Sequence, residues 1–314
     1  MSTFIQSRPS RVRALFALVV LALVSLMSGN AVAEPLKVVA SFSILGDLIQ
    51  QIGGERVSVH TLVGPDADAH VFQPTPADAK TIAEANLVIV NGLGFEGWFS
   101  RLIKSSGYRG SVVIASNGIK PLKSAEETHH DEHEANHEGD ADPHAWQDLS
   151  NVLIYVDNIV QALVKADPQG RNEYLVKAAS YKHEISTLDS ELKNTFTAIS
   201  KERRKVVTTH DAFGYFSRAY GIAFLSPVGI NTEAEPSAGD LARLIKQIRR
   251  EKIPAVFMEN ISDPRLLERI RLESGARIGG TLFSDALSKK NGPASNYLEM
   301  MRYNAKTLAA ALAR

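Results

Sequence analysis

The chain has 314 residues, with 35 basic and 35 acidic side chains and no cysteine. This charge balance offers nothing that would attract nucleic acid or an anionic membrane surface. Without cysteine the fold has no disulfides and must be held by its core, and no cysteine can carry a lipid.

Residues 1–33 have the pattern of a secretory signal peptide. Arg8, Arg11 and Arg13 form a basic start, an apolar run over 14–27 follows, and an Ala-Val-Ala cleavage site ends at Ala33. A retained N-terminal anchor is the alternative interpretation. We expect a mature chain that starts near Glu34, lies in the periplasm and is not a lipoprotein. Cleavage removes three arginines, which leaves 32 basic against 35 acidic side chains.

Residues 34–166 are predicted to form a first α/β lobe. Runs rich in β-branched residues predict strands over 36–40, 57–62, 87–90 and 112–114, and helical patterns lie at 44–52 and 76–85. Thr75 followed by Pro76 is a typical helix start. The alternation of strands and helices predicts a parallel sheet flanked by helices.

The segment 126–142 of this lobe is rich in histidine and acid. It contains almost nothing apolar, so it cannot bury a core and is predicted to be a mobile loop. We interpret it as a low-affinity metal collector; a solvated charged loop without ligands is the alternative. Its match to the H-x-x-E-H protease pattern is expected to be accidental, because the segment lacks an apolar helix face. Its histidines are His129, His130, His133 and His137.

Residues 167–203 are predicted to form one long helix between two lobes. Apolar residues recur every three or four positions and give a stripe of about seven helical turns. A helix of this length would act as a stiff spine rather than as a flexible hinge. The stripe consists of Tyr174, Ala178, Tyr181, Ile185, Leu188, Leu192, Phe196 and Ile199.

Residues 204–314 repeat the pattern of the first lobe. Strands are predicted at 206–209, 222–225, 255–258 and 276–279, and helices at 239–250, 264–274 and 294–313. The predicted fold class is therefore α/β, with two lobes that each hold a parallel sheet flanked by helices, joined by the rigid spine helix.

Four metal-type side chains stand in Pro- or Gly-punctuated loops or just after strand-like runs: His70, His144, His210 and Asp285. Three imidazoles and one carboxylate form a complete shell for a borderline ion such as zinc. In α/β lobes, ligands collect where loops leave the carboxyl edge of a sheet. Two candidates fall in each half of the chain, so a bound ion would bridge the lobes.

Other histidines and the nearby aromatics receive separate interpretations. His60 and His183 are expected to have no metal role. Aromatic residues near the candidate ligands are expected to form an apolar wall that excludes water. These aromatics are Phe72, Trp146, Phe213, Tyr215 and Phe216.

The ordered motifs resemble one family over essentially the whole mature chain. They are D-A-H-x-F-x-P-T-P-x-D at 68–78, D-P-H-x-W at 142–146, T-H-D-A-F-G-Y-F at 209–216, E-A-E-P-S at 233–237, F-M-E at 257–259 and S-D-A-L at 284–287. The chain resembles the cluster A-I metal-binding solute-binding proteins of zinc and manganese ABC importers. It is ZnuA-like and most similar to the AztC-like zinc branch.

The resemblance implies a function and a ligand set. It implies two α/β lobes joined by a long helix and metal ligands His70, His144, His210 and Asp285. Manganese-type relatives tend to carry glutamate where this chain has His210, so the third imidazole favours zinc over manganese. The implied partners are an ABC permease with its ATPase, and for the AztC-like branch a periplasmic metallochaperone; we expect a monomer that binds no nucleic acid.

Three other functions compete with a zinc-binding component of an importer. The first is a manganese- or iron-type protein of the same family. The second is a zinc hydrolase, which would need an open metal position and Glu259 as its base; a filled four-ligand shell argues against it, so we expect no enzyme. The third is an adhesin-like surface protein, which the missing lipid-bearing cysteine disfavours. Because imidazole binds metal only when neutral, affinity is expected to fall below about pH 6.

Overall fold

The computed structural model describes residues 34–123 and 141–313, and a compact unit begins at Leu36. The expected signal peptide, residues 1–33, and the four histidines at 129, 130, 133 and 137 lie outside the described residues. Among the helices of the described ranges, none is both long and apolar enough to cross a membrane.

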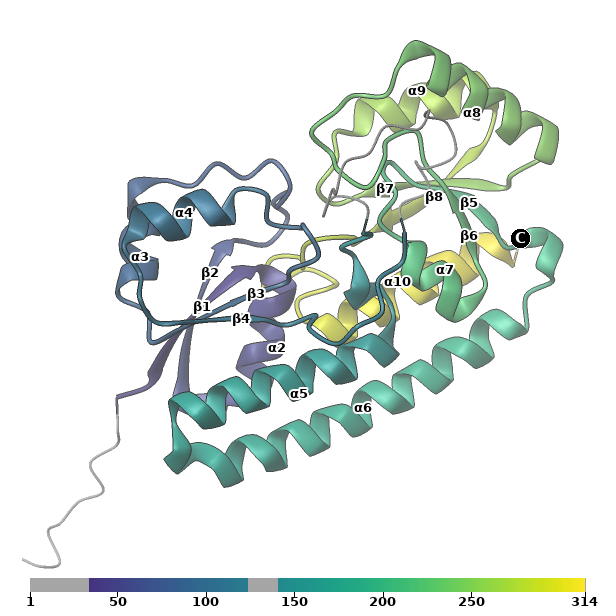
Figure 1. Ribbon diagram of the computed structural model, residues 1–314. Helices are drawn as coiled ribbons and strands as arrows, with labels where there is room; N and C mark the ends of the chain where they lie inside the picture. Colours follow the sequence, from purple (N-terminus) through teal and green to yellow (C-terminus); the bar gives the residue numbers. More distant parts are fainter. Residues whose placement is uncertain (1–33, 124–140, 314) are drawn as a thin grey trace, which may run out of the picture. The chain divides into compact units, whose positions relative to one another are not determined.

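Four parallel strands form the first sheet in the order β2-β1-β3-β4. The strands are β1 Leu36–Phe42, β2 Val57–Val63, β3 Leu87–Val90 and β4 Ser111–Ile114. The helices of this lobe are α2 Ser43–Gly53, α3 Pro76–Ala83, α4 Phe99–Ser106 and α5 Leu149–Ala166. Helix α2 packs on β1 and β2, α5 packs on β3 and β4, and α3 and α4 pack together on the other side of the sheet (Figure 1).

The second sheet has the same parallel arrangement, in the order β6-β5-β7-β8. Its strands are β5 Lys205–Val207, β6 Ala223–Leu225, β7 Ala255–Glu259 and β8 Arg277–Leu282. Its helices are α7 Gly214–Tyr220, α8 Ala238–Glu251, α9 Pro264–Ser274 and α10 Tyr297–Leu312. Short 3-10 turns lie at Gly54–Arg56, Ala145–Gln147, Pro168–Gly170 and Lys201–Arg203.

Helix α6, Arg171–Thr197, is the predicted spine and has 27 residues. The predicted stripe is buried from Tyr174 to Phe196, while Ile199 lies just beyond the helix end. The helix packs on α2 and α5 of the first lobe and on α7 and α10 of the second (Figure 1). It therefore braces both lobes along its length.

The apolar core runs continuously from one lobe to the other. One buried cluster includes β1 and β3 of the first sheet, α5 and α6, and α10 of the second lobe. A separate, smaller cluster fills the space between the second sheet and helices α8 and α9. Because interiors are close-packed, a core shared in this way resists rotation of one lobe against the other.

The predicted α/β fold with two parallel sheets is confirmed, and each predicted strand and helix has an observed counterpart. Three helices were not predicted: α4, α5 and α7. The predicted last helix over 294–313 begins later, at Tyr297, because the side chain of Asn296 caps it by accepting a hydrogen bond from the Glu299 N–H.

Candidate metal centre

The four candidate ligands meet in one buried cluster. One ligand atom from each of His70, His144, His210 and Asp285 lies within 4.8 Å of all the others, and all four residues are buried. His70 follows β2, His210 follows β5 and Asp285 follows β8, while His144 lies directly before the turn Ala145–Gln147 that leads into α5. Three of the four loops thus leave the carboxyl end of a parallel strand, as expected for a ligand site in α/β lobes.

Four of the six pairs among these residues have atoms at separations close to those around a tetrahedral ion. His70 Nε2 lies 3.3 Å from His144 Nε2 and 3.3 Å from Asp285 Oδ2. His210 Nε2 lies 3.1 Å from Asp285 Oδ2, and His144 Nε2 lies 3.6 Å from Asp285 Oδ1. Zinc bonds of about 2.0–2.1 Å place tetrahedral ligand atoms about 3.3 Å apart. Asp285 Oδ1 is buried without a hydrogen-bond partner, which leaves an acceptor oxygen free for a cation.

His70 is held by its own loop. Its N–H donates to Asp68 Oδ1 at 2.8 Å, and Trp98 Nε1 donates to the carbonyl of Ala69 at 2.8 Å. The carboxylate of Asp68 also accepts from Thr232 Oγ1 of the second lobe at 2.6 Å. The first-lobe ligand is therefore positioned partly by the second lobe.

His144 is held by Asp142, two residues earlier. Asp142 Oδ1 lies 2.8 Å from His144 Nδ1 and also accepts the His144 N–H at 2.9 Å. A carboxylate on the far nitrogen fixes the ring so that Nε2 presents its lone pair to the cluster.

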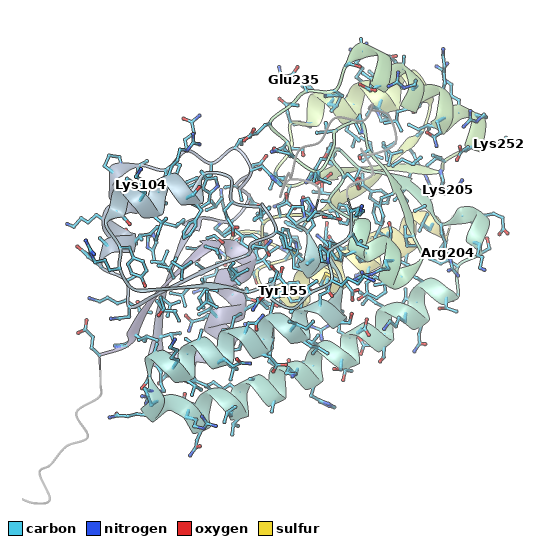
Figure 2. All side chains as sticks on the ribbon, viewed as in Figure 1. Lys104, Tyr155, Arg204, Lys205, Glu235 and Lys252 are labelled. Atoms are coloured by element: carbon cyan, nitrogen blue, oxygen red, sulfur yellow. The ribbon has the colours of Figure 1, made fainter. Side chains whose placement is uncertain are left out.

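A buried polar network supports this loop from the first sheet. Asn91 Nδ2 donates to the carbonyl of Pro143 at 3.0 Å, and Tyr155 OH donates to Asn91 Oδ1 at 2.5 Å. Tyr155, labelled in Figure 2, comes from helix α5. Glu96 accepts from Ser41 Oγ and from the Asn91 N–H, each at 2.6 Å. Burial raises the pKa of Glu96 although these donors oppose the shift.

His210 is held by Glu259, at the end of β7. His210 Nδ1 lies 2.6 Å from Glu259 Oε2 in a buried ion pair, and the His210 N–H donates to Glu259 Oε1 at 2.9 Å. The N–H and hydroxyl of Thr209 donate to the same Oε1 at 2.8 and 2.6 Å. Glu259 is thus engaged in orienting the His210 loop.

The charges of the cluster reinforce one another. Burial lowers the pKa of His144, but the carboxylates of Asp285 and Asp142 outweigh it and raise this pKa to about 9. Burial likewise opposes protonation of His210, yet Glu259 and Asp285 raise its pKa well above the ordinary value. Burial would raise the pKa of Asp285, but the two imidazoles hold it well below its usual range. The metal-free cluster therefore retains protons that an incoming cation must displace.

The apolar wall beside the candidate ligands differs from the one predicted: of the predicted aromatics Trp146 contributes to it, and Phe95, which was not predicted, does too. Phe95 packs edge-on against His70 at 4.9 Å between ring centroids, and Trp146 contacts His144 at 5.3 Å. Phe72 instead packs on Trp98, and Phe213 stacks on Phe224 within the second lobe. Phe216 packs on Phe196 and Tyr220, and the hydroxyl of Tyr215 donates to the carbonyl of Asp142. Of the five predicted aromatics, Trp146 is the one whose ring contacts a candidate ligand histidine in the described part of the chain.

The other histidines of the described ranges lie apart from the cluster. His60 is exposed on β2 and His183 is exposed on α6. The sequence interpretation missed the orienting roles of Asp142, Glu259 and Asn91. Two of these had a signal: Asp142 stands in the D-P-H motif and Glu259 in the F-M-E motif, whereas Asn91 follows β3 with no distinguishing pattern.

A cleft of about 640 Å³ adjoins His210. Its wall near the cluster includes Thr209 and His210 from the β5 loop, together with Asp68 and Thr232. Glu235 and Asp263 line it farther out, beside Arg265 and Arg269. Of the four candidate ligands, His210 is the one that lines this cleft.

Comparison with known proteins gives a consistent set of relatives. A family model described as ZnuA, zinc-uptake complex component A, periplasmic, matches residues 38–311. The iron-binding protein YfeA of Yersinia pestis is 34% identical over 307 residues, covering 95% of each chain. The manganese ABC transporter substrate-binding lipoprotein PsaA of Streptococcus pneumoniae is 31% identical over 291 residues, covering 91% of each.

Solved structures share the fold. The periplasmic zinc-binding protein TroA from Treponema pallidum superposes with a TM-score of 0.81 at 30% identity, covering 90% of this chain and 100% of that one. A manganese-bound periplasmic metal-binding protein from Candidatus Liberibacter asiaticus gives a TM-score of 0.77 at 30% identity, covering 88% and 99%. The relatives thus differ in the metal that their names carry.

Proposed function

The chain belongs to the ZnuA family of periplasmic metal-binding components of ABC importers, and on that premise we propose that its cargo is zinc, bound by His70, His144, His210 and Asp285. The observation that carries the proposal is the buried cluster of three imidazoles and one carboxylate, with atom separations of 3.1–3.6 Å between neighbouring ligands. That spacing and that donor set suit a tetrahedral borderline ion.

The choice between zinc and manganese rests on the donors. Manganese prefers oxygen ligands and an octahedral shell, whereas nitrogen-rich sites bind zinc more tightly than manganese. Here three of the four donors are imidazole nitrogens and Asp285 supplies the one carboxylate of the set. The nearby carboxylates of Asp142 and Glu259 face the Nδ1 atoms of His144 and His210 instead. A manganese- or iron-type function is the second candidate, because relatives such as PsaA and YfeA carry those metals in their names.

The position of the cluster between the lobes suggests how the ion would be released to a partner. The ligands come from both lobes, so a partner that displaces one loop would remove a ligand and weaken the hold on the ion. We infer that the partner is an inner-membrane ABC permease with its ATPase. Loading of this protein by a periplasmic metallochaperone, and collection of metal by His129, His130, His133 and His137, belong to the same proposal.

Hydrolytic chemistry has little support in the geometry. A catalytic zinc keeps an open position for water, whereas four protein ligands complete a tetrahedral shell. Glu259, the candidate base, is buried and engaged with Thr209 and His210. We expect zinc-loaded protein to show no ester or peptide turnover; turnover that scales with zinc occupancy and disappears in His144→Ala would contradict this.

The ligand assignment is tested by metal stoichiometry and affinity in single variants. His70→Ala, His144→Ala, His210→Ala and Asp285→Ala should each lower zinc affinity by more than about 100-fold, since even partners behind a ligand are worth about 10–100-fold. His183→Ala removes an exposed histidine of α6 and serves as the control. If the four variants bind zinc as tightly as the control, the site lies elsewhere.

A further inference from the structure

Two adjacent residues at the carboxyl end of β7 contact three of the four ligand loops. Glu259 holds the His210 loop, as described above. Asn260 follows it, and its Nδ2 donates to Asp66 Oδ1 and to the carbonyl of Ala286, each at 3.1 Å. Asp66 belongs to the loop that carries His70, and Ala286 follows Asp285 directly. One amide group therefore ties two ligand loops from different lobes.

The backbone around this amide strengthens the tie. The Asn260 N–H donates to the carbonyl of Leu282, at the end of β8 where the Asp285 loop begins, at 3.0 Å. The Asp66 N–H donates to the carbonyl of Leu287 at 2.9 Å. Asp66 has φ of 55°, in the left-handed region that a non-glycine residue adopts only at a cost. Its position thus depends on contacts such as these.

The chemistry of the contact fixes which way the amide points. Both groups that face Nδ2, a carboxylate and a carbonyl oxygen, can only accept. A flipped amide would place Oδ1 against two acceptors, so the NH2 group must face them. Asn260 Oδ1 is buried without a hydrogen-bond partner, so nothing on that side of the side chain competes for its orientation.

We propose that Asn260 is a positioning residue that holds the His70 and Asp285 loops in their metal-binding arrangement and thereby slows release of the ion. The inference rests on the proposed function, since it takes His70 and Asp285 as ligands. His144 is held separately through Asp142 and Asn91, and Thr232 remains bonded to Asp68 when Asn260 changes. Loss of Asn260 should therefore weaken the site without abolishing it.

The sharpest variant is Asn260→Asp, which keeps the size of the side chain but sets a carboxylate against the Asp66 carboxylate and the Ala286 carbonyl. We expect zinc still to bind with a stoichiometry of one but to dissociate up to about 10-fold faster, because Asn260 holds the ligand loops rather than a ligand side chain, whose direct partners are worth about 10–100-fold in affinity. Dissociation is followed by transfer to a chelator in excess. The visible spectrum of the cobalt-loaded protein reports whether the ligand geometry is loosened.

Two further variants keep the test decisive. Asn260→Ala removes both donors without adding repulsion and should speed dissociation less than Asn260→Asp. In the double variant Asp66→Asn, Asn260→Asp, the amide at 66 can donate to the carboxylate at 260, so dissociation should be slower than in Asn260→Asp alone. Asparagine tolerates the left-handed backbone at position 66.

The matched control is Asn86→Asp, an exposed change that keeps the Oδ1 acceptor for the Lys37 N–H. Unchanged dissociation in both Asn260→Asp and Asn260→Ala, or no slowing in the double variant, would overturn the inference. Failure of the proposed function has a different signature. The unmodified protein would then hold no zinc, or His210→Ala would bind it as tightly as the unmodified protein.

Discussion

At the scale of single residues, two ligand imidazoles each carry a carboxylate on the nitrogen that faces away from the cluster. Asp142 lies 2.8 Å from Nδ1 of His144, and Glu259 lies 2.6 Å from Nδ1 of His210. Such partners fix the tautomer and raise the basicity of the coordinating nitrogen. On the proposed ligand set, we therefore expect these two acids to support metal binding although neither belongs to the four ligands.

Variants of Asp142 distinguish its role as a hydrogen-bond acceptor for His144 from the effect of its negative charge. Asp142→Ala should lower zinc affinity by about 10–100-fold, because His144 loses the acceptor for its ring and for its N–H. Asp142→Asn retains an acceptor oxygen and should lose less. The measurement is competition with a chelator of known affinity, with Asp157→Ala as the control, since Asp157 pairs on the surface with Lys182. Equal affinity in Asp142→Ala and the control would contradict the role.

The histidines of the cluster also set a pH dependence, which lies higher than the sequence alone suggested. Carboxylates raise the pKa of His144 to about 9 and that of His210 in the same direction. In the metal-free protein, the stability contributed by these protonated rings is present below the unfolded pKa of about 6.5 and is lost as pH rises through the folded pKa.

We therefore expect the thermal midpoint of the metal-free protein to fall between pH 7 and pH 9 while its zinc affinity rises, because fewer protons remain to be displaced. Both are measured on one preparation across this range, with zinc-loaded protein as the reference for stability. An affinity that stays flat from pH 6 to pH 9 would show that these imidazoles do not bind the ion.

At the scale of elements, the sequence predicts well what depends on local periodicity. The stripe of α6 is long and regular, and every member up to Phe196 is buried. Helix α4 has Leu102 as its one buried residue, and α7 is only seven residues long, so neither offers a periodic signal of useful length. Helix α5 does carry a helical pattern of buried residues such as Val152, Tyr155, Val156 and Ile159, so periodicity alone is enough to predict it.

At the candidate site, too, some features can be predicted from the sequence and others cannot. The four candidate ligands each stand in a local motif, and taken together these motifs let the sequence nominate them. The aromatic wall could not be predicted, because Phe95 approaches His70 only after β3 and the β2 loop come together in space. Asn260 is likewise invisible in the sequence, since its partners at 66 and 286 are distant along the chain.

Helix α6 offers a matched pair of leucines that tests its bracing role. Leu188 is 1% exposed and Leu175 is 42% exposed on the same helix. Leu188→Ala should reduce the free energy of unfolding by about 2–5 kcal/mol through lost burial and a cavity. Leu175→Ala should change it by less than about 1 kcal/mol. Urea unfolding of both metal-free variants is the measurement, and similar losses for the two would mean that α6 is not packed as described.

At the scale of the whole described unit, the candidate ligand cluster lies between two lobes that are already joined by other means. The shared core, the spine helix and the bonds of Trp146 Nε1 and Gln147 Nε2 to the carbonyl of Ser284 all cross between the lobes. On the proposed function, we expect capture of an ion to need displacement of protons and adjustment of loops rather than closure of a hinge. The donor set, and not the extent of closure, then carries the choice of metal.

The central claim is that three imidazoles and one carboxylate make this family member select zinc. The most direct measurement is competition between zinc and manganese for the unmodified protein, beside His210→Glu. We predict one tightly held zinc that excess manganese does not displace, and a weaker preference in the variant, in which an oxygen donor replaces a nitrogen donor. Manganese binding as tight as zinc binding in the unmodified protein would contradict the claim and place the chain with the manganese-type proteins.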